Sequence, residues 1–152
     1  MDNRYSKFTI LISNINKYIN KIKTEEMAEF GLKAVHVSCL FYLNKHEDGL
    51  TASQLCSLCE EDKALISRSL DYLEDQELVI CQNNEENNKK YRAKLFLTDK
   101  GKDIAKKITI ITDNAVENGS NGVSHSDRET MYKTLEIISE NLKKICDKFG
   151  EK

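Results

Sequence analysis

Residues 50–101 read LTASQLCSLCEEDKALISRSLDYLEDQELVICQNNEENNKKYRAKLFLTDKG, and this stretch decides the fold of the chain. Two short helical patterns are joined by a tight acidic turn. A β-hairpin pattern follows, and then a new helix begins. This order is the outline of a winged helix-turn-helix, a unit that places one helix in a DNA groove. We therefore expect a mainly α fold with a small β-hairpin.

The two motif helices carry recognisable start signals. Thr51 is followed three residues later by Gln54, the pattern of a capping box, and Asp62 is placed to cap the second helix. In the second helix, the apolar residues Ile66, Leu70 and Leu73 recur at helical spacing and define the buried side.

The opposite side of that second helix must face outward. A row of small and basic residues near a helix N-terminus is what a reader of the major groove needs. The predicted DNA-binding residues of this helix are Lys63, Ala64, Ser67, Arg68 and Asp71.

Charge is distributed unevenly along the chain, which has a formal net charge of -2. Residues 87–107 contain eight basic and two acidic side chains, a local excess of +6, whereas residues 47–77 contain nine acidic and two basic ones. The wing therefore suits phosphate better than the helix-turn-helix body does. The predicted DNA-binding residues of the wing are Lys89, Lys90 and Arg92.

Long amphipathic helices are predicted at both ends of the chain. An apolar stripe runs from Phe8 to Ile22, and a second runs from Met131 to Ile145 after a predicted capping box at Ser126 and Glu129. These stripes either pack within one chain or form a dimer interface, and we expect a dimer. We assign residues 1–152 to a single domain, residues 33–100 to the winged helix-turn-helix core, and residues 1–30 and 101–152 to dimerisation helices. Within these, residues 33–45 should form a buried central helix and residues 114–124 a polar connector.

Composition excludes several classes of protein. No apolar run is long enough to span a bilayer, and the first residues lack the apolar core of a signal peptide, so we expect a cytoplasmic protein without a membrane partner. The five cysteines are odd in number and irregularly spaced, which argues against a disulfide framework. The sequence lacks the common catalytic and nucleotide-binding motifs, so we expect no enzyme, no cofactor and no metal.

At this point the residues resemble a known family, the MarR-type (multiple antibiotic resistance regulator) winged-helix regulators. The resemblance is close over about residues 31–101. It implies a homodimeric transcriptional regulator, usually a repressor, that binds a palindromic operator in double-stranded DNA. It also implies release of the DNA by a small molecule, often aromatic and anionic, or by an oxidant.

The resemblance assigns roles to individual residues. Ser67 and Arg68 match the Ser-Arg pair of the family's recognition helix, and Lys63 matches a residue near the DNA backbone. Arg92 lies close to the position of an arginine that enters the minor groove. The family's acidic residue two positions earlier is missing here, which leaves Lys89, Lys90 and Arg92 as alternatives. Glu60 stands where the family commonly has glycine.

Two alternative functions compete with DNA binding. The acidic helix-turn-helix segment, residues 47–77, is compatible with a winged-helix module that binds protein. The pair Cys56 and Cys59, three residues apart, suggests a thiol-based redox sensor or a zinc site. Helical phase instead places both cysteines on an apolar face, where a free cysteine acts as a small hydrophobic residue, and this structural interpretation is preferred. His36 is expected to be a core or interface histidine and His46 a surface one.

Overall fold

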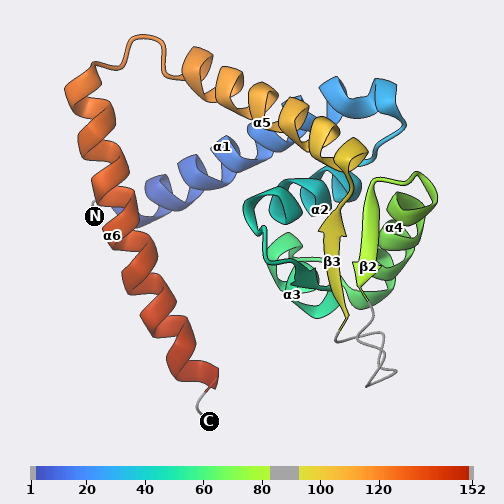
Figure 1. Cartoon of the computed structure of the whole chain (residues 1–152). Helices are drawn as coiled ribbons and strands as arrows, with labels where there is room; N and C mark the ends of the chain where they lie inside the picture. The colour runs from blue at the N-terminus through green and yellow to red at the C-terminus, as the bar shows by residue number, and fades with distance from the viewer. Residues whose placement is uncertain (1–2, 83–92, 151–152) are drawn as a thin grey trace. The chain divides into compact units, whose positions relative to one another are not determined.

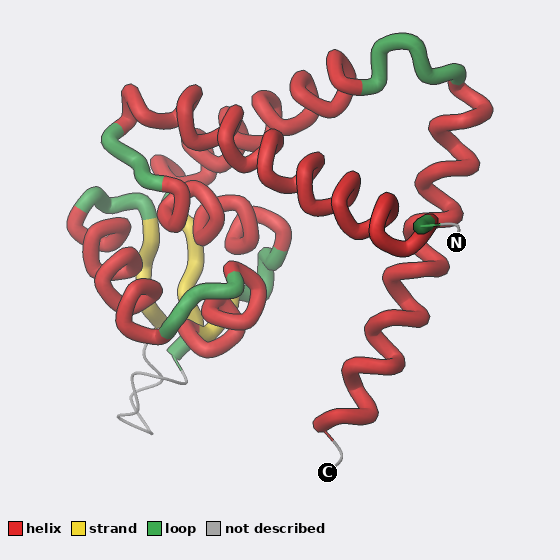
Figure 2. Tube along the Cα trace, turned by 180° about the vertical axis from the view of Figure 1, so that it is seen from behind, coloured by secondary structure: helices red, strands yellow, loops and turns green. Residues whose placement is uncertain are grey.

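The computed structural model describes residues 3–82 and 93–150 of the chain. The chain divides into two compact units, Met1–Ala115 and Val116–Lys152. Helix accounts for most of both units, and the strands are short (Figure 2). The predicted fold class, a mainly helical winged helix-turn-helix with long helices at both ends, is confirmed.

The first unit contains five helices, a 3-10 turn and three strands within its described residues (Figure 1). In chain order they are α1 (Arg4–Met27), η1 (Ala28–Phe30), α2 (Ala34–Lys45), β1 (Leu50–Thr51), α3 (Ala52–Cys59), α4 (Lys63–Asp75), β2 (Val79–Gln82), β3 (Lys94–Leu97) and the start of α5 (Asp99–Gly119). The core lies between α2, α3, α4 and the sheet, and its fully buried side chains include Leu40, Leu55, Ile66 and Leu73.

The sheet is antiparallel, with strand order β1-β3-β2. Val79 pairs with Leu97 and Cys81 with Leu95, as the predicted hairpin requires. The short strand β1 adds an edge on the other side of β3, where Leu50 pairs with Leu95. Sequence reasoning missed β1, because two residues are too few to show an alternating pattern.

Helix α2 runs through the centre of the unit, as its nearly all-round apolar sequence predicted. Its buried side chains include Val37, Cys39, Leu40 and Leu43. The buried side chains of helix α1, Lys23 and Met27, lie near its C-terminal end, and Lys23 Nζ lies 4.8 Å from the centroid of the Phe41 ring. Burial lowers the pKa of Lys23.

Both predicted caps of the motif helices are present. Thr51 Oγ1 accepts the Gln54 N–H at 3.2 Å, while Gln54 Oε1 accepts the Thr51 N–H at 2.9 Å, which completes the capping box. Asp62 Oδ1 accepts the Leu65 N–H at 2.7 Å at the start of α4. Between these helices Glu60 adopts a left-handed conformation with φ 54° and ψ 41°. This conformation explains why glycine would suit the position.

The second unit contains the end of α5 and helix α6 (His125–Gly150). The predicted connector at residues 114–124 was wrong in extent, since α5 continues as helix to Gly119. Relative to alanine, an asparagine or glycine destabilises a helix by no more than about 1 kcal/mol. This cost does not outweigh the backbone hydrogen bonds that each further helical residue adds. The predicted cap at Ser126 was also wrong: Ser124 Oγ accepts the Asp127 N–H at 3.1 Å.

The start of α5 lies directly against the backbone that precedes β2. A Cβ atom added to Gly101 would collide with the carbonyl group of Leu78, whereas nothing lies within 4 Å of one added to Gly119 on the same helix. Thr98 fixes this approach, because its Oγ1 accepts the Gly101 N–H at 2.9 Å and donates to the Glu77 carbonyl at 2.6 Å.

We predict that Gly101→Ala lowers the free energy of unfolding by about 1–3 kcal/mol. The added methyl group has no room between helix α5 and the backbone of Leu78. Urea unfolding followed by circular dichroism, at one fixed protein concentration, measures this. In the matched control Gly119→Ala, the stability should stay the same or rise by less than about 1 kcal/mol. Equal stabilities of the two variants would contradict the close approach.

We predict that Glu60→Gly raises the free energy of unfolding by about 0.5–1 kcal/mol, because glycine adopts the left-handed conformation without steric cost. Glu61→Gly removes the same charge one residue later, where φ is not positive, and should lower the stability. The same urea titration compares the two. A loss of stability in Glu60→Gly would show that the turn is not left-handed in solution.

Candidate nucleic-acid interface

Helix α4 separates its residues into a buried and an exposed side, as predicted. Ile66, Leu70 and Leu73 are buried, together with Ser69, whose hydroxyl donates to the Leu65 carbonyl at 2.7 Å. All five residues predicted to contact DNA from this helix are exposed: Lys63, Ala64, Ser67, Arg68 and Asp71. The structure thus brings them together on one solvent-facing surface, which we call the α4 surface. Their contact with DNA stays a prediction.

The α4 surface is held at its two ends by different contacts. At the N-terminal end, the Asp62 cap satisfies a backbone donor and places a carboxylate where the helix dipole favours it. Toward the C-terminal end, the Tyr72 hydroxyl donates to the Gly31 carbonyl at 2.8 Å. Gly31 follows η1 with φ 73°, so Tyr72 ties α4 to the link between α1 and α2.

His36 completes the support behind Tyr72. The two rings stack with centroids 4.4 Å apart, and His36 Nδ1 accepts the Lys33 N–H at 3.0 Å. Burial lowers the pKa of His36, and the Lys33 ammonium group lowers it further, so the imidazole is neutral and able to accept this bond at neutral pH. His36 is buried and His46 exposed, as predicted. No local sequence pattern indicates that His36 stacks on Tyr72, because the two residues lie on different helices.

The predicted wing residues Lys89, Lys90 and Arg92 lie outside the described residues. The structure describes the other lysines of residues 87–107, and several of them contact other parts of the first unit. Lys94 Nζ donates to the Asp48 carbonyl at 3.2 Å, and Lys100 Nζ donates to the Gln76 carbonyl at 2.9 Å. Lys107 Nζ lies 4.6 Å from the centroid of the Phe30 ring. The segment that looked like one basic patch in sequence therefore distributes its cations over several parts of the unit.

The cysteines are all free thiols. Cys56 and Cys59 are half-buried and pack against the core, as the structural interpretation of this pair requires. The hydrogen bond that Cys39 donates to Cys59 raises the pKa of Cys39, which burial raises further, and lowers the pKa of Cys59. Within residues 3–82 and 93–150, no group of three or more His, Cys, Asp or Glu residues is arranged to hold a metal ion.

No helix in the described part of the chain is both long and apolar enough to cross a membrane.

Comparison with known proteins gives two kinds of match. The model of the MarR family matches residues 30–86, which include α2, β1, α3, α4 and β2. A search of curated proteins gives no match. Among solved structures, a MarR transcriptional regulator from Methanosarcina mazei Go1 is 23% identical, with 95% of this chain and 94% of that chain covered and a TM-score of 0.78.

Two other similar structures contain DNA. A MarR-family regulator from Listeria monocytogenes in complex with a 26mer DNA is 22% identical, with 86% of this chain and 85% of that chain covered and a TM-score of 0.70. The MepR-DNA complex of Staphylococcus aureus is 20% identical, with 89% and 96% covered and a TM-score of 0.67. The model of the MarR family thus matches the central part of this chain, residues 30–86, and the fold of the chain is that of these solved MarR-family regulators.

Proposed function

We propose that this protein is a sequence-specific DNA-binding transcriptional regulator without enzymatic activity. It acts as a homodimer on a palindromic operator and represses transcription until a small-molecule effector releases it. The observation that carries this proposal is the α4 surface: a helix whose apolar side is buried presents small and basic residues to solvent near its N-terminus. Similar chains of the same fold have been solved with DNA, which supports the assignment.

The chemistry of the α4 surface suits the major groove. The guanidinium group of Arg68 can donate two hydrogen bonds to guanine, the Ser67 hydroxyl can donate to or accept from any base edge, and Ala64 leaves room for a thymine methyl group. Lys63 stands in the first turn, where an ammonium group can reach a phosphate. Asp71 lies one turn beyond Ser67, and its carboxylate can accept from a cytosine amino group.

Charge sets the affinity of this surface. A chain with a net charge of -2 has no global attraction for DNA, and the exposed acidic residues on either side of α4 oppose binding. One of those carboxylates, Asp62, is occupied as a helix cap. Non-specific binding should therefore be weak, and specific binding should depend on base contacts together with the basic residues assigned to the wing, Lys89, Lys90 and Arg92.

The proposed dimer interface uses the apolar stripes of α1 and α6. On α1, Phe8, Ile12, Ile15 and Ile22 are exposed, with 38–54% of each surface accessible. On α6, 26 residues long, no described side chain is buried, although Leu142 and Ile145 belong to a regular apolar stripe. Such a stripe is stable in water only when something covers it, and a second copy can cover all of it symmetrically.

Binding to the DNA upstream of the protein's own gene tests the proposal. Fluorescence anisotropy at about 0.1 M salt should give a specific complex at micromolar dimer or below, with unrelated DNA of equal length bound more weakly. Equal affinity for both DNAs would refute sequence-specific recognition, and no binding to either would refute DNA binding.

We predict that Arg68→Ala weakens operator binding by about 1–3 kcal/mol, which is roughly 5- to 150-fold, because a bidentate contact with a base is lost. The control is Lys17→Ala, which removes an exposed cation from α1 and should leave the affinity within about twofold. Neutralising Lys89, Lys90 or Arg92 should act differently, weakening all sequences alike and reducing the salt slope by about one unit.

These two classes of variant separate recognition from electrostatic attraction. If wing neutralisation changed neither the affinity nor the salt slope while Arg68→Ala abolished binding, the assignment of the wing to DNA would be wrong.

We predict that the chain is a stable homodimer, with twice the 17.5 kDa mass of one chain in light scattering at micromolar concentration. Leu142→Glu places a charge in the α6 stripe and should shift the mass toward that of the monomer. Ile137→Glu makes the same change off the stripe, where the side chain is 60% exposed, and should leave the dimer intact. A mass of 17.5 kDa for the unmodified chain would refute the dimer.

A further inference from the structure

The chain has three histidines, and one of them, His36, is buried. It stands in the first turn of α2 with 6% of its surface accessible, whereas His46 and His125 are exposed. Histidine is the side chain whose charge ordinarily changes between about pH 5 and pH 8. The contacts of the His36 ring decide what a proton would do at this place.

The hydrogen bond at Nδ1 of His36 fixes the protonation state of the ring. Its donor is the backbone N–H of Lys33, at 3.0 Å, and a backbone N–H can only donate. Nδ1 therefore carries a lone pair, and the ring is neutral with its hydrogen on Nε2. A further proton would be taken up at Nδ1, where the new N–H would point at the Lys33 N–H.

The surroundings of the ring disfavour its charged form. The Lys33 ammonium group acts on it from the link before α2, the positive end of the α2 dipole lies in the same turn, and the Tyr72 phenol covers it from α4. No carboxylate among the described residues forms an ion pair with His36. Burial, and after it the Lys33 charge, lowers the pKa of His36. The fold thus favours a neutral ring.

Tyr72 connects this ring to α4. The two rings stack with centroids 4.4 Å apart and 16° between their planes. The Tyr72 hydroxyl donates to the Gly31 carbonyl at 2.8 Å, and a Cβ added to Gly31 would lie only 3.1 Å from the Tyr72 oxygen. Tyr72 follows Arg68 by one helical turn, so the two residues are neighbours on α4. A displacement of Tyr72 therefore also displaces the turn that presents Arg68.

We propose that His36 makes the α4 surface sensitive to acid. Uptake of a proton at Nδ1 breaks the bond to the Lys33 N–H, moves the imidazole away from Tyr72, and weakens the binding of DNA by α4. The last step rests on the proposed function. The change at His36 and Tyr72 is a property of the chain alone.

The same proton lowers the stability of the fold. Because folding lowers the pKa of His36, the unfolded chain takes up the proton more readily than the folded chain does. The stabilisation from the neutral ring is complete above the ordinary histidine pKa of about 6.5, and it is lost as the pH falls from there through the pKa of the folded state. This part of the pH dependence should be absent in His36→Gln.

Acid has two opposite effects on DNA binding by such a chain. Protonation makes the chain more positive, and this alone strengthens binding to a polyanion. A loss of affinity on acidification therefore indicates a specific change at the DNA-binding surface and not the change in net charge.

NMR of the full-length chain between about pH 8 and pH 5 tests the change at the ring. Long-range ¹H–¹⁵N spectra separate the three histidines, and His36 is assigned by the absence of its signals in His36→Gln. We expect the Nε2–H tautomer at pH 8 and a titration midpoint below about 6.5. The Tyr72 ring signals should shift with the same midpoint.

Fluorescence anisotropy at about 0.1 M salt, with the DNA upstream of the protein's own gene, then measures binding on both sides of that midpoint. One pH unit below the midpoint, the affinity of the unmodified chain should be lower by about threefold or more. The limit is about tenfold per pH unit, reached when only the neutral form binds.

The variant His36→Gln removes the titration and keeps the hydrogen bond. His36 is the third residue of α2, where glutamine completes a capping box, so the amide oxygen can accept the Lys33 N–H and takes up no proton. This variant should bind DNA at least as tightly in acid as at pH 8.

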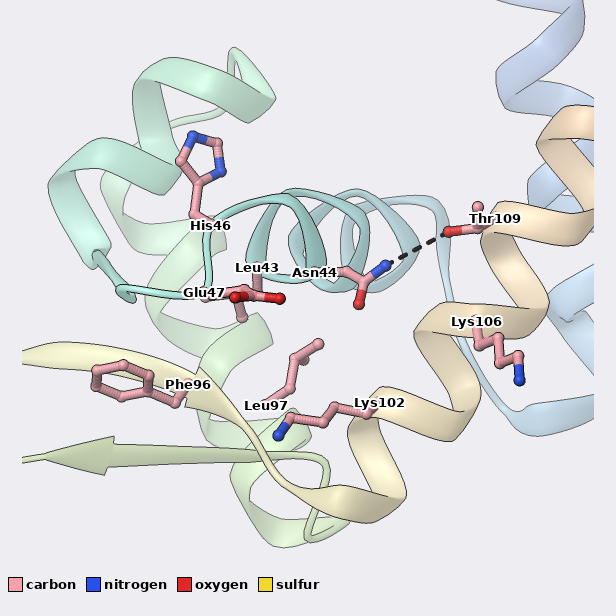
Figure 3. Close-up of a pocket in the computed structure, with 9 residues that line it drawn as sticks. All are labelled: Leu43, Asn44, His46, Glu47, Phe96, Leu97, Lys102, Lys106 and Thr109. Atoms are coloured by element: carbon pink, nitrogen blue, oxygen red, sulfur yellow. Dashed lines mark hydrogen bonds between the residues drawn. The ribbon is translucent and has the colours of Figure 1, made fainter.

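The matched control is His46→Gln. His46 lies at the other end of α2, beside a cavity lined by residues of α2, β3 and α5 (Figure 3), and its Nδ1 lies 2.8 Å from the carbonyl of Tyr42. It is exposed and has no contact with the Tyr72 ring, so His46→Gln should lose affinity in acid as the unmodified chain does.

Five results would overturn the inference. In the NMR titration they are a neutral ring with its hydrogen on Nδ1, a ring that stays neutral down to about pH 5, and Tyr72 signals that do not follow His36. In the binding measurement they are an affinity of the unmodified chain that does not fall in acid, and an equal fall in His36→Gln. Absence of binding at pH 8 would instead refute the proposed function, and the Tyr72 signals would still decide whether His36 acts on α4.

Discussion

The orientation of α4 depends on one close backbone approach, that of Gly101 to the carbonyl of Leu78. The same carbonyl accepts the Thr98 N–H at 3.1 Å, and the Thr98 hydroxyl bonds to the carbonyl of Glu77, which has the left-handed φ of 61°. The end of α4, the start of β2 and the first turn of α5 are therefore joined within a few residues. Because β2 and β3 pair along their whole length, this junction also fixes the base of the wing relative to α4. Helix α4 and the paired strands β2 and β3 are therefore positioned together.

Sequence reasoning succeeded where the determining interactions are local. Helix caps at Thr51 and Asp62 bond to backbone three residues away, and the inner side of α4 follows from helical spacing alone. The predictions failed where a weak local preference, such as that of asparagine for loops, was overridden by the surrounding helix. Asn114 and Asn118 suggested a connector, yet α5 continues through them, and of two serines near the start of α6 only Ser124 makes the cap. Strand β1 exists because β3 offers it a free edge, which is a long-range pairing.

The candidate interface was likewise predictable where it depends on local helical spacing, and not where it depends on long-range contacts. The exposed residues of α4 could be named because burial of Ile66, Leu70 and Leu73 leaves the other side free. The role of the basic segment, residues 87–107, was harder to predict. Counting charges along a sequence does not show where each ammonium group is bound. Lys94 and Lys100 hold backbone carbonyls, whereas Lys102 and Lys106 border a cavity that α2 closes from a distant part of the chain. The contact of Tyr72 with Gly31 likewise joins residues 41 positions apart.

We propose that α4 reads base edges in the major groove of two half-sites. Dimethyl sulfate protection of the operator tests it directly, because the reagent methylates guanine N7 in the major groove and adenine N3 in the minor groove. We expect protection of guanine N7 in two patches about one helical turn apart, related by the symmetry of the proposed dimer, and loss of that protection in Arg68→Ala. Binding without any guanine N7 protection, at an operator that contains guanines in both half-sites, would contradict it.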